Sequence, residues 1–208
     1  MIKIRELEEK LQYLLSFEVP NISLEQYSTS SHIASRILYV AQTQYADITN
    51  QYVADLGTGC GILSVGSSIL GAASVIGFDI DMHALQIRAD NYASLGLFSE
   101  AVCCDVLRLS PGTFDRFFDT VIMNPPFGTK HNAGSDMKFL EIASKLSQGV
   151  IYSLHKTSTR RHIIRKSAQL GMECDVLAEL KFDIPLIYKF HKKKSTNVAV
   201  DFIRFCHK

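Results

Sequence analysis

Cysteine pairs with metal-ligand spacing are absent from this chain of 208 residues. Its five cysteines include no C-x-x-C pair, and Cys103 and Cys104 are adjacent, a spacing that suits neither a zinc knuckle nor a disulfide framework. The histidines also lack metal-ligand spacing, so we expect no metal site. This use of cysteine favours a reducing compartment.

Net charge and long apolar runs are also scarce. Lysine and arginine number 22 against 21 acidic residues, so a net charge of +1 excludes any global attraction to polyanions. No apolar run approaches the roughly 20 residues of a membrane span, and we expect neither secretion nor membrane insertion. The hydrophobic content of 47% is enough for a sizeable core. We expect one domain over 1–208, with an N-terminal helical extension at 1–48 and a catalytic core at 49–208.

The texture of the chain changes at residue 51. Before it, helical spacing of apolar residues predicts helices at 3–15 and 31–46, separated by a polar loop at 25–30. After it, short apolar runs alternate with helical segments, which predicts a parallel sheet with crossover helices. The predicted strands are Tyr52–Leu56, Ser74–Asp79, Glu100–Cys104, Phe118–Met123 and Val150–Leu154, and the predicted helices are 62–70, 82–95, 136–147 and 157–170.

Two β-rich segments, 173–182 and 197–205, end the chain without a helix between them. They predict an antiparallel hairpin at one end of the sheet. The expected architecture is therefore an α/β, Rossmann-like, doubly wound sheet of seven strands with an antiparallel C-terminal strand.

A glycine-rich segment, Gly57-Thr58-Gly59-Cys60-Gly61, follows the first predicted strand. Glycines at alternate positions let the backbone turn tightly and approach a ligand closely. A dinucleotide site would show G-x-G-x-x-G, but position 62 is Ile and Asp55 precedes the first glycine. A ligand without phosphate, S-adenosylmethionine, fits better, because its ammonium suits an acidic residue at this strand end.

Aspartates stand at the ends of the first three predicted strands. Asp55 suits the ammonium, Asp79 suits the ribose hydroxyls about twenty residues past the glycines, and Asp105 suits the adenine amino group. Asp81 is interpreted as a helix cap. Ligands of open α/β sheets bind beyond the carboxyl ends of the strands, where these aspartates fall.

The segment Asn124-Pro125-Pro126-Phe127 follows the fourth predicted strand and is expected to be catalytic. Its prolines stiffen the backbone and fix the directions of the carbonyl groups and of the Asn124 amide. Hydrogen bonds from an amino group to the Asn124 side-chain oxygen and the Pro125 carbonyl would aim the nitrogen lone pair at a methyl donor. Phe127 could stack on a target base that is unpaired or flipped out.

These motifs resemble the class I amino-methyltransferases that carry an (Asn/Asp/Ser)-Pro-Pro-aromatic motif. More closely, the chain resembles the eukaryotic methyltransferase-like family that forms N6-methyladenosine in 18S ribosomal RNA. The resemblance runs from about Glu6 to Phe205 and includes the specific segments Leu24 to Tyr27, Tyr152 to Lys156 and Tyr188 to Lys194. The sequence departs from the family pattern with Ser28 in place of a usual proline and Thr58 in place of a common cysteine.

The resemblance implies an S-adenosylmethionine-dependent enzyme acting on adenine N6 of ribosomal RNA, most closely the 18S RNA of the small subunit. It implies a heterodimer with a small zinc-containing activator subunit near the second and third strands, and a location in the nucleus, including the nucleolus, and in the cytoplasm. Together with the aspartates and glycines above, the implied cofactor contacts are Gln26, Thr29, Asp55, Gly57, Gly59, Cys60, Ile62, Asp79, Asp105 and Val106.

Basic residues near the expected site suggest RNA contacts. Lys192, Lys193 and Lys194 precede the last predicted strand, and a neighbouring predicted helix carries further cations: Lys156, Arg160, Arg161, Arg165 and Lys166. The histidines at 32, 131, 155 and 162 are interpreted as loop or surface residues, with His155 at the entrance of the site.

Two alternatives stay open. Glutamine N5-methylation of a protein uses a similar Asn-Pro-Pro-aromatic site, because a glutamine amide offers the same two N–H groups. The other alternative is a binding module that keeps the fold but has no catalytic activity. The intact Asp55, Asp79, Asp105 and Asn124 argue against this alternative.

Overall fold

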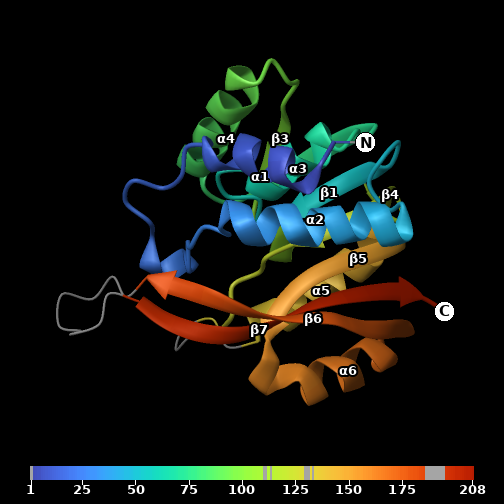
Figure 1. The fold of residues 1–208 in the computed structure, drawn as a ribbon. Coiled ribbons are helices and arrows are strands. Elements are labelled where there is room, and N and C mark those ends of the chain that lie inside the picture. The colour runs from blue at the N-terminus through green and yellow to red at the C-terminus, as the bar shows by residue number, and fades with distance from the viewer. Residues whose placement is uncertain (1, 110–111, 113, 129–131, 133, 186–194) are drawn as a thin grey trace.

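The computed structural model describes the chain except residues 1, 110–111, 113, 129–131, 133 and 186–194 (Figure 1). The strands of the described chain form one sheet in the order β3-β2-β1-β4-β5-β7-β6. Their bounds are β1 Tyr52–Leu56, β2 Ser74–Asp79, β3 Glu100–Cys103, β4 Phe118–Met123, β5 Ser147–Lys156, β6 Met172–Pro185 and β7 Ser195–His207. The strands β1 to β5 pair in parallel, and β7 runs antiparallel to both β5 and β6.

Helices cover both faces of this sheet. Their bounds are α1 Ile4–Gln12, α2 Ser31–Tyr45, α3 Ile62–Ile69, α4 Met82–Ser94, α5 Ser135–Leu146 and α6 Arg160–Gln169. Figure 1 shows α1, α2 and α3 together on the viewer's side of β1, whereas α6 lies beside β6 and β7 at the far end of the sheet. The doubly wound fold predicted from the sequence is confirmed.

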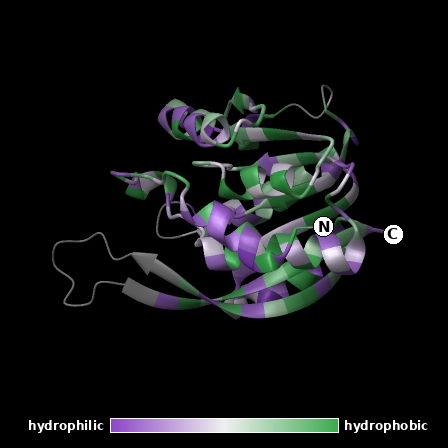
Figure 2. Ribbon diagram, turned by 45° about the horizontal axis from the view of Figure 1, so that its top comes forward, coloured by the Kyte–Doolittle hydropathy of each residue, from purple (hydrophilic) through white to green (hydrophobic). Residues whose placement is uncertain are grey.

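Two apolar cores explain this layering. Successive residues of a strand point to opposite faces, and β1 accordingly places Val53 in one core and Ala54 in the other. The first core joins the sheet to α1, α2, α3 and α4, and the second joins it to α5 and α6. Figure 2 shows hydrophobic residues concentrated in the central strands, while hydrophilic residues recur along the helices.

The N-terminal helices pack directly on the catalytic core. Leu7 and Leu11 of α1 are buried, and they share a core cluster with Leu38 of α2. At Gly66 of α3 the side chain of Leu38 lies so close that an added Cβ would clash, so the glycine permits the approach of α2. Ser30 caps α2 by accepting a hydrogen bond from the Ile33 amide.

The elements predicted from sequence match the observed ones closely in place and type. The main differences lie at their ends: α1 ends at Gln12, β5 extends over Ser147–Lys156, and both hairpin strands are longer than predicted. Backbone pairing between neighbouring strands continues past the apolar run, because hydrogen bonds of a sheet do not depend on side-chain polarity.

Candidate functional site

A cavity of about 360 Å³ lies beyond the carboxyl ends of the parallel strands. Its volume is in the range of small-molecule sites. It is lined by the glycine loop after β1, the ends of β2 and β3, the segment after β4 and the N-terminal segment. Every residue expected to contact the cofactor lines this cavity, namely Gln26, Thr29, Asp55, Gly57, Gly59, Cys60, Ile62, Asp79, Asp105 and Val106. The contacts with a cofactor stay a prediction.

The glycine loop depends on backbone angles that only glycine adopts readily. Gly57, Gly59 and Gly61 have φ values of 70°, 53° and 86°. At Gly61 an added Cβ would also clash with the side chain of Arg88, a residue of α4. The Gly57 amide donates to the Phe78 carbonyl at 2.8 Å, which fixes the loop against the end of β2.

Asp55 is buried at the end of β1 with one carboxylate oxygen left for a ligand. Its Oδ2 accepts hydrogen bonds from the hydroxyls of Thr58 at 2.8 Å and Ser64 at 2.6 Å. Its Oδ1 is buried and has no hydrogen-bond partner among the described residues. Burial raises the pKa of the carboxyl, while the two hydroxyls and the charge of Arg88 oppose that rise. The Thr58 hydroxyl therefore favours the ionised form of Asp55.

Asp79 and Asp81 organise the end of β2. Asp79 accepts the Gly59 amide at 2.7 Å and the Asp81 amide at 2.9 Å, one on each oxygen, and each oxygen retains a further lone pair for a ligand hydroxyl. Burial raises the pKa of Asp79. Asp81 caps α4 through the His83 amide, as expected, and its other oxygen accepts from Gln26 Nε2 at 2.6 Å. The Gln26 bond leads the causes that lower the pKa of Asp81.

Asp105, after β3, and Cys60, in the glycine loop, have side chains with less freedom to bind a ligand than Asp79. Asp105 caps a short 3₁₀ turn by accepting the Leu107 amide at 3.0 Å, and its carboxylate also pairs with exposed Arg108. Val106 is buried beside it. Burial raises the pKa of the Cys60 thiol to about 12, so the thiol stays neutral and Cys60 offers the cavity mainly its backbone.

Asn91 joins the N-terminal segment to the glycine loop, a role that the sequence did not indicate. Its Oδ1 accepts the Leu15 amide at 2.7 Å, and its Nδ2 donates to the carbonyls of Leu15 and Cys60 at 2.9 Å each. Asn91 is buried on α4. Phe17 follows this clamp and lies over Gly59, so the N-terminal segment forms part of the cavity wall.

Asn124 stands at the end of β4 with its two amide ends in different environments. Its Nδ2 donates to the Thr29 hydroxyl at 3.0 Å. Its Oδ1 is buried without a hydrogen-bond partner in the described chain. Asn124 and Pro126 line the cavity, whereas Pro125 and Phe127 are not part of its lining. The amide oxygen is thus available to an incoming donor.

Tyr27 covers the aromatic ring of the motif. The rings of Tyr27 and Phe127 are stacked with centroids 5.2 Å apart, and the Tyr27 hydroxyl donates to the Pro125 carbonyl at 3.3 Å. Burial raises the pKa of Tyr27 well above its ordinary range, so the phenol stays a donor. Phe127 is only 5% exposed. The predicted stacking of a target base on Phe127 would therefore require Tyr27 to move, which the sequence did not indicate.

The prediction that His155 is a surface residue at the entrance of the site is wrong. It is fully buried on β5, where its Nδ1 lies 3.3 Å from Asp136 Oδ2 at the start of α5. Burial raises the pKa of Asp136, but the hydrogen bond and charge of His155 outweigh it and lower the pKa overall. This pair holds the start of α5, just after the catalytic motif. The strand β5 is buried continuously from Val150 to His155, and a sequence pattern does not show that a histidine at its end is enclosed.

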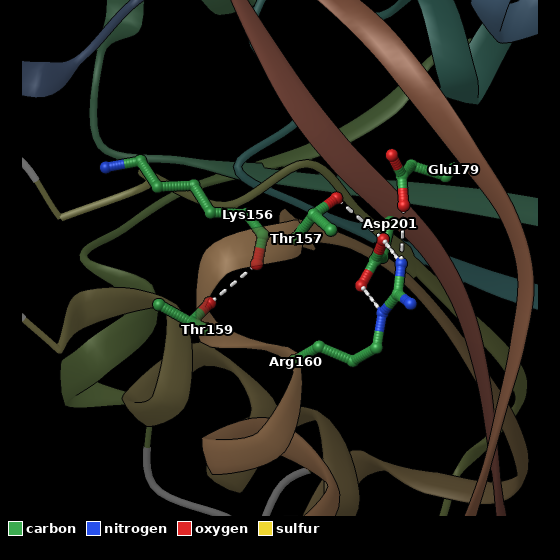
Figure 3. A network of polar contacts seen from close by, with 6 residues as sticks. All are labelled: Lys156, Thr157, Thr159, Arg160, Glu179 and Asp201. Atoms are coloured by element: carbon green, nitrogen blue, oxygen red, sulfur yellow. Dashed lines mark hydrogen bonds and ion pairs between the residues drawn. The ribbon is translucent and has the colours of Figure 1, made fainter.

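Arg160 is also less free than the sequence suggested. Figure 3 shows its guanidinium directed at Asp201 and Glu179, with distances of 2.6 and 2.8 Å. Thr157 donates to the same Asp201 carboxylate at 2.7 Å. Arg161 and Arg165 of α6 remain exposed. Lys192, Lys193 and Lys194, which are predicted to contact RNA, lie outside the described residues. His131 lies outside them as well.

The cavity fits the chemistry of S-adenosylmethionine. Two of its buried oxygens lack partners among the described residues, namely Asp55 Oδ1 and Asn124 Oδ1. Both are acceptors, and unpartnered buried acceptors are costly unless a ligand supplies donors.

The described residues contain no group of three or more possible metal ligands. No helix in the described part of the chain is long and apolar enough to span a membrane.

Comparisons with known proteins agree with this geometry. The family model "Ribosomal protein L11 methyltransferase (PrmA)" matches residues 30–124. The rRNA N(6)-adenosine-methyltransferase METTL5 of Danio rerio is 51% identical over 98% of this chain and 99% of its own length. The rRNA N(6)-adenosine-methyltransferase Mettl5 of Drosophila melanogaster is 48% identical over 98% of this chain and 96% of its own.

A solved structure extends the likeness to three dimensions. The crystal structure of a candidate RNA methyltransferase from Pyrococcus horikoshii superposes with a TM-score of 0.86 at 36% identity, over 100% of this chain and 98% of that one. Near-complete coverage in both directions includes the N-terminal helices and the C-terminal hairpin. From its sequence, its fold and its motifs, the chain belongs to the rRNA N(6)-adenosine-methyltransferase family that includes METTL5.

Proposed function

We propose that this protein transfers a methyl group from S-adenosylmethionine to N6 of an adenosine in ribosomal RNA, specifically the 18S RNA of the small subunit. One observation carries the proposal. The side-chain oxygen of Asn124 is buried and has no hydrogen-bond partner among the described residues, and Asn124 lines the same cavity as the strand-end aspartates. Full-length relatives named as rRNA N(6)-adenosine-methyltransferases support the substrate.

The chain's own residues would bind the cofactor by charge and hydrogen bonding. Asp55 would accept from the ammonium, Asp79 from the ribose hydroxyls, and Asp105 from the adenine amino group. When bound, S-adenosylmethionine supplies an electrophilic methyl carbon on its sulfonium. The glycines at 57, 59 and 61 have no side chains of their own, which lets a ligand approach the backbone closely.

The catalytic motif would orient the amino group of the target base. Asn124 Oδ1 would accept one of its N–H groups. The Pro125 carbonyl accepts the Tyr27 hydroxyl and does not line the cavity in this structure, so it would accept the second N–H group only after Tyr27 moves. Together these bonds would favour tetrahedral character at nitrogen and direct the lone pair into the cavity. No general base with a perturbed pKa is required, because the proton becomes acidic only as the N–C bond forms and then passes to solvent. Position and hydrogen bonding therefore account for the catalysis.

Glutamine N5-methylation of a protein is the alternative, because a glutamine amide offers the same two N–H groups to the Asn124 motif. The family model of ribosomal protein L11 methyltransferase, named for a protein substrate, matches residues 30–124. That match covers the cofactor half of the site and stops at Asn124, before the rest of the motif. The full-length relatives cover both halves, and their names favour RNA.

A transfer assay separates these substrates. The protein is incubated with S-adenosylmethionine labelled in the methyl group and with either total RNA or RNA-free protein extract. We expect label in RNA as N6-methyladenosine. Label confined to protein would refute the RNA substrate, and mapping the label in ribosomal RNA identifies the subunit.

Replacing Asn124 tests the motif. Asn124→Ala removes the amide that accepts from the target amino group but leaves the aspartates intact, so transfer to RNA should be abolished. Cofactor affinity should stay within about threefold, a change under ~1 kcal/mol. Retained turnover in this variant would contradict the role of Asn124.

The zinc-containing activator subunit and the cellular location are further parts of the proposal. The strand β3 is an edge of the sheet, and exposed apolar side chains flank it and β2: Ile80, Met82, Phe98 and Leu107. An added strand from a partner would cover such an edge. Because 18S RNA is assembled in the nucleolus and used in the cytoplasm, we place the protein in the nucleus, including the nucleolus, and in the cytoplasm.

A further inference from the structure

The side-chain amide of Asn124 works only in one orientation. Its oxygen end accepts N–H groups, whereas its nitrogen end donates and would repel the amino group of a base. The two ends have nearly the same shape, so packing alone does not distinguish them. A hydrogen-bond partner at the far end of the amide would hold the oxygen end in a defined position.

Thr29 is the group that contacts the other end of this amide. Its hydroxyl lies 3.0 Å from Asn124 Nδ2, across 95 positions of sequence. Thr29 is 5% exposed and lines the same cavity as Asn124. A hydroxyl that accepts this hydrogen bond still has one hydrogen to donate elsewhere. The contact takes up the nitrogen end and leaves Oδ1 for the substrate.

The backbone around Thr29 is fixed at several points. The next residue, Ser30, caps α2. On the other side, Tyr27 reaches the Pro125 carbonyl and Gln26 binds Asp81 at the start of α4. The N-terminal segment is therefore attached to both the cofactor half and the catalytic half of the site, and the Thr29 hydroxyl has a defined place.

We infer that Thr29 is a positioning residue for methyl transfer, acting through the orientation of the Asn124 amide. The inference rests on the proposed function, because it takes the Asn124 oxygen to be the acceptor for the target amino group. Without the hydroxyl, the amide loses the hydrogen bond that fixes its far end. The amide plane can then turn about the Cβ–Cγ bond, and Oδ1 no longer keeps a defined position toward the target amino group.

Two substitutions at Thr29 test this role. Thr29→Val keeps the shape and removes the hydroxyl, whereas Thr29→Ser keeps the hydroxyl and removes a methyl group. At saturating S-adenosylmethionine, the single-turnover rate on RNA should fall about tenfold in Thr29→Val, the size expected for one lost hydrogen bond. In Thr29→Ser it should stay within about twofold of the unsubstituted protein.

Cofactor binding and folding are measured in the same variants. Calorimetric titration gives the affinity for S-adenosylmethionine, and thermal unfolding gives Tm. Saturating cofactor separates a loss of orientation from a loss of cofactor affinity, and rescue by serine separates it from a loss of packing. If Thr29→Val does not fold, Thr29→Ala removes the same hydroxyl and replaces it in the comparison.

An unchanged rate in the variant without the hydroxyl overturns the positioning role. An equal loss in the valine and serine variants overturns it too, because the hydroxyl would then not be the cause. The Asn124→Ala variant distinguishes the two levels of the argument. If Asn124→Ala is inactive while Thr29→Val is fully active, only the role of Thr29 fails, whereas an active Asn124→Ala refutes the proposed chemistry itself.

Discussion

Asp55 shows how single residues divide their bonding between fold and ligand. Its Oδ2 accepts hydrogen bonds from two hydroxyls, and its Oδ1 is buried without a partner in the described chain. Burying a carboxylate is costly unless it is hydrogen-bonded, and the pKa of Asp55 is raised for this reason. The residue is thus held ready for a cation at some cost to the free protein.

The variant Asp55→Asn should therefore bind cofactor poorly while folding well. The amide keeps the size of the side chain but removes the charge that would meet the ammonium. We expect the affinity for S-adenosylmethionine to weaken at least about tenfold, as for a lost charge-assisted hydrogen bond. Calorimetric titration measures this effect.

Glu141→Gln is the matched control for that titration. Glu141 lies on α5 in a half-exposed pair with Lys145, away from the cavity lining. Its affinity should equal that of the unsubstituted protein. Equal affinity in both variants would exclude Asp55 from the ammonium site.

Between elements, buried polar groups hold the turn after β5 in place. Asp201 of β7 is fully buried and accepts from Thr157 and Arg160, which bracket the start of α6 (Figure 3). Burial acts to raise the pKa of Asp201, but the hydrogen bonds from Arg160 and Thr157 prevail and lower it. The network joins β7, β6 and α6 next to the catalytic edge of the sheet.

Removing the Asp201 charge should destabilise the protein more than removing that of Glu179. Asp201→Asn leaves Arg160 facing an amide and should lower the free energy of unfolding by about 2–3 kcal/mol. Glu179→Gln loses a contact at 56% side-chain exposure and should cost less than about 1 kcal/mol. Urea unfolding at neutral pH compares the two, and equal losses would contradict the network's role.

The same network has a predictable pH dependence. A carboxyl whose pKa is depressed in the folded protein contributes stability above its unfolded value of 3.8, and that contribution disappears as pH falls through the folded value. The difference in stability between Asp201→Asn and the unsubstituted protein should therefore shrink on acidification below pH 3.8. A constant difference would exclude ionisation of Asp201 as its cause.

For the whole molecule, the two edges of the sheet differ. One edge, β6, is flanked by α6, whereas β3 at the other edge is short and lies near Phe98, which is 85% exposed. Open strand edges beside apolar surface favour association with other chains. The proposed activator subunit would bind at β3.

Coexpression with the zinc-containing activator subunit tests that surface. The chain alone should be poorly soluble, and coexpression should restore soluble heterodimer. Phe98→Asp should reduce the heterodimer recovered by affinity purification several-fold. Ile164→Asp, at a 44% exposed position on α6 near the opposite edge, should not. An active, monodisperse monomer, or equal recovery of both variants, would contradict the partner surface.

The sequence by itself determined the elements, their order and the residues at the strand ends. Periodicity of apolar residues specifies a helix or strand locally, and parallel strands bring their carboxyl ends to one edge. Asp55, Asp79, Asp105 and Asn124 therefore meet at one cavity as the sequence indicated.

Only the tertiary structure decided which distant side chains touch. The Thr29 to Asn124 contact spans 95 positions, and the clamp from Asn91 to Leu15 spans 76. The burial of His155 and the cover of Tyr27 over Phe127 are of the same kind. Such contacts depend on how layers pack, and the local spacing of residues carries no record of which faces come together.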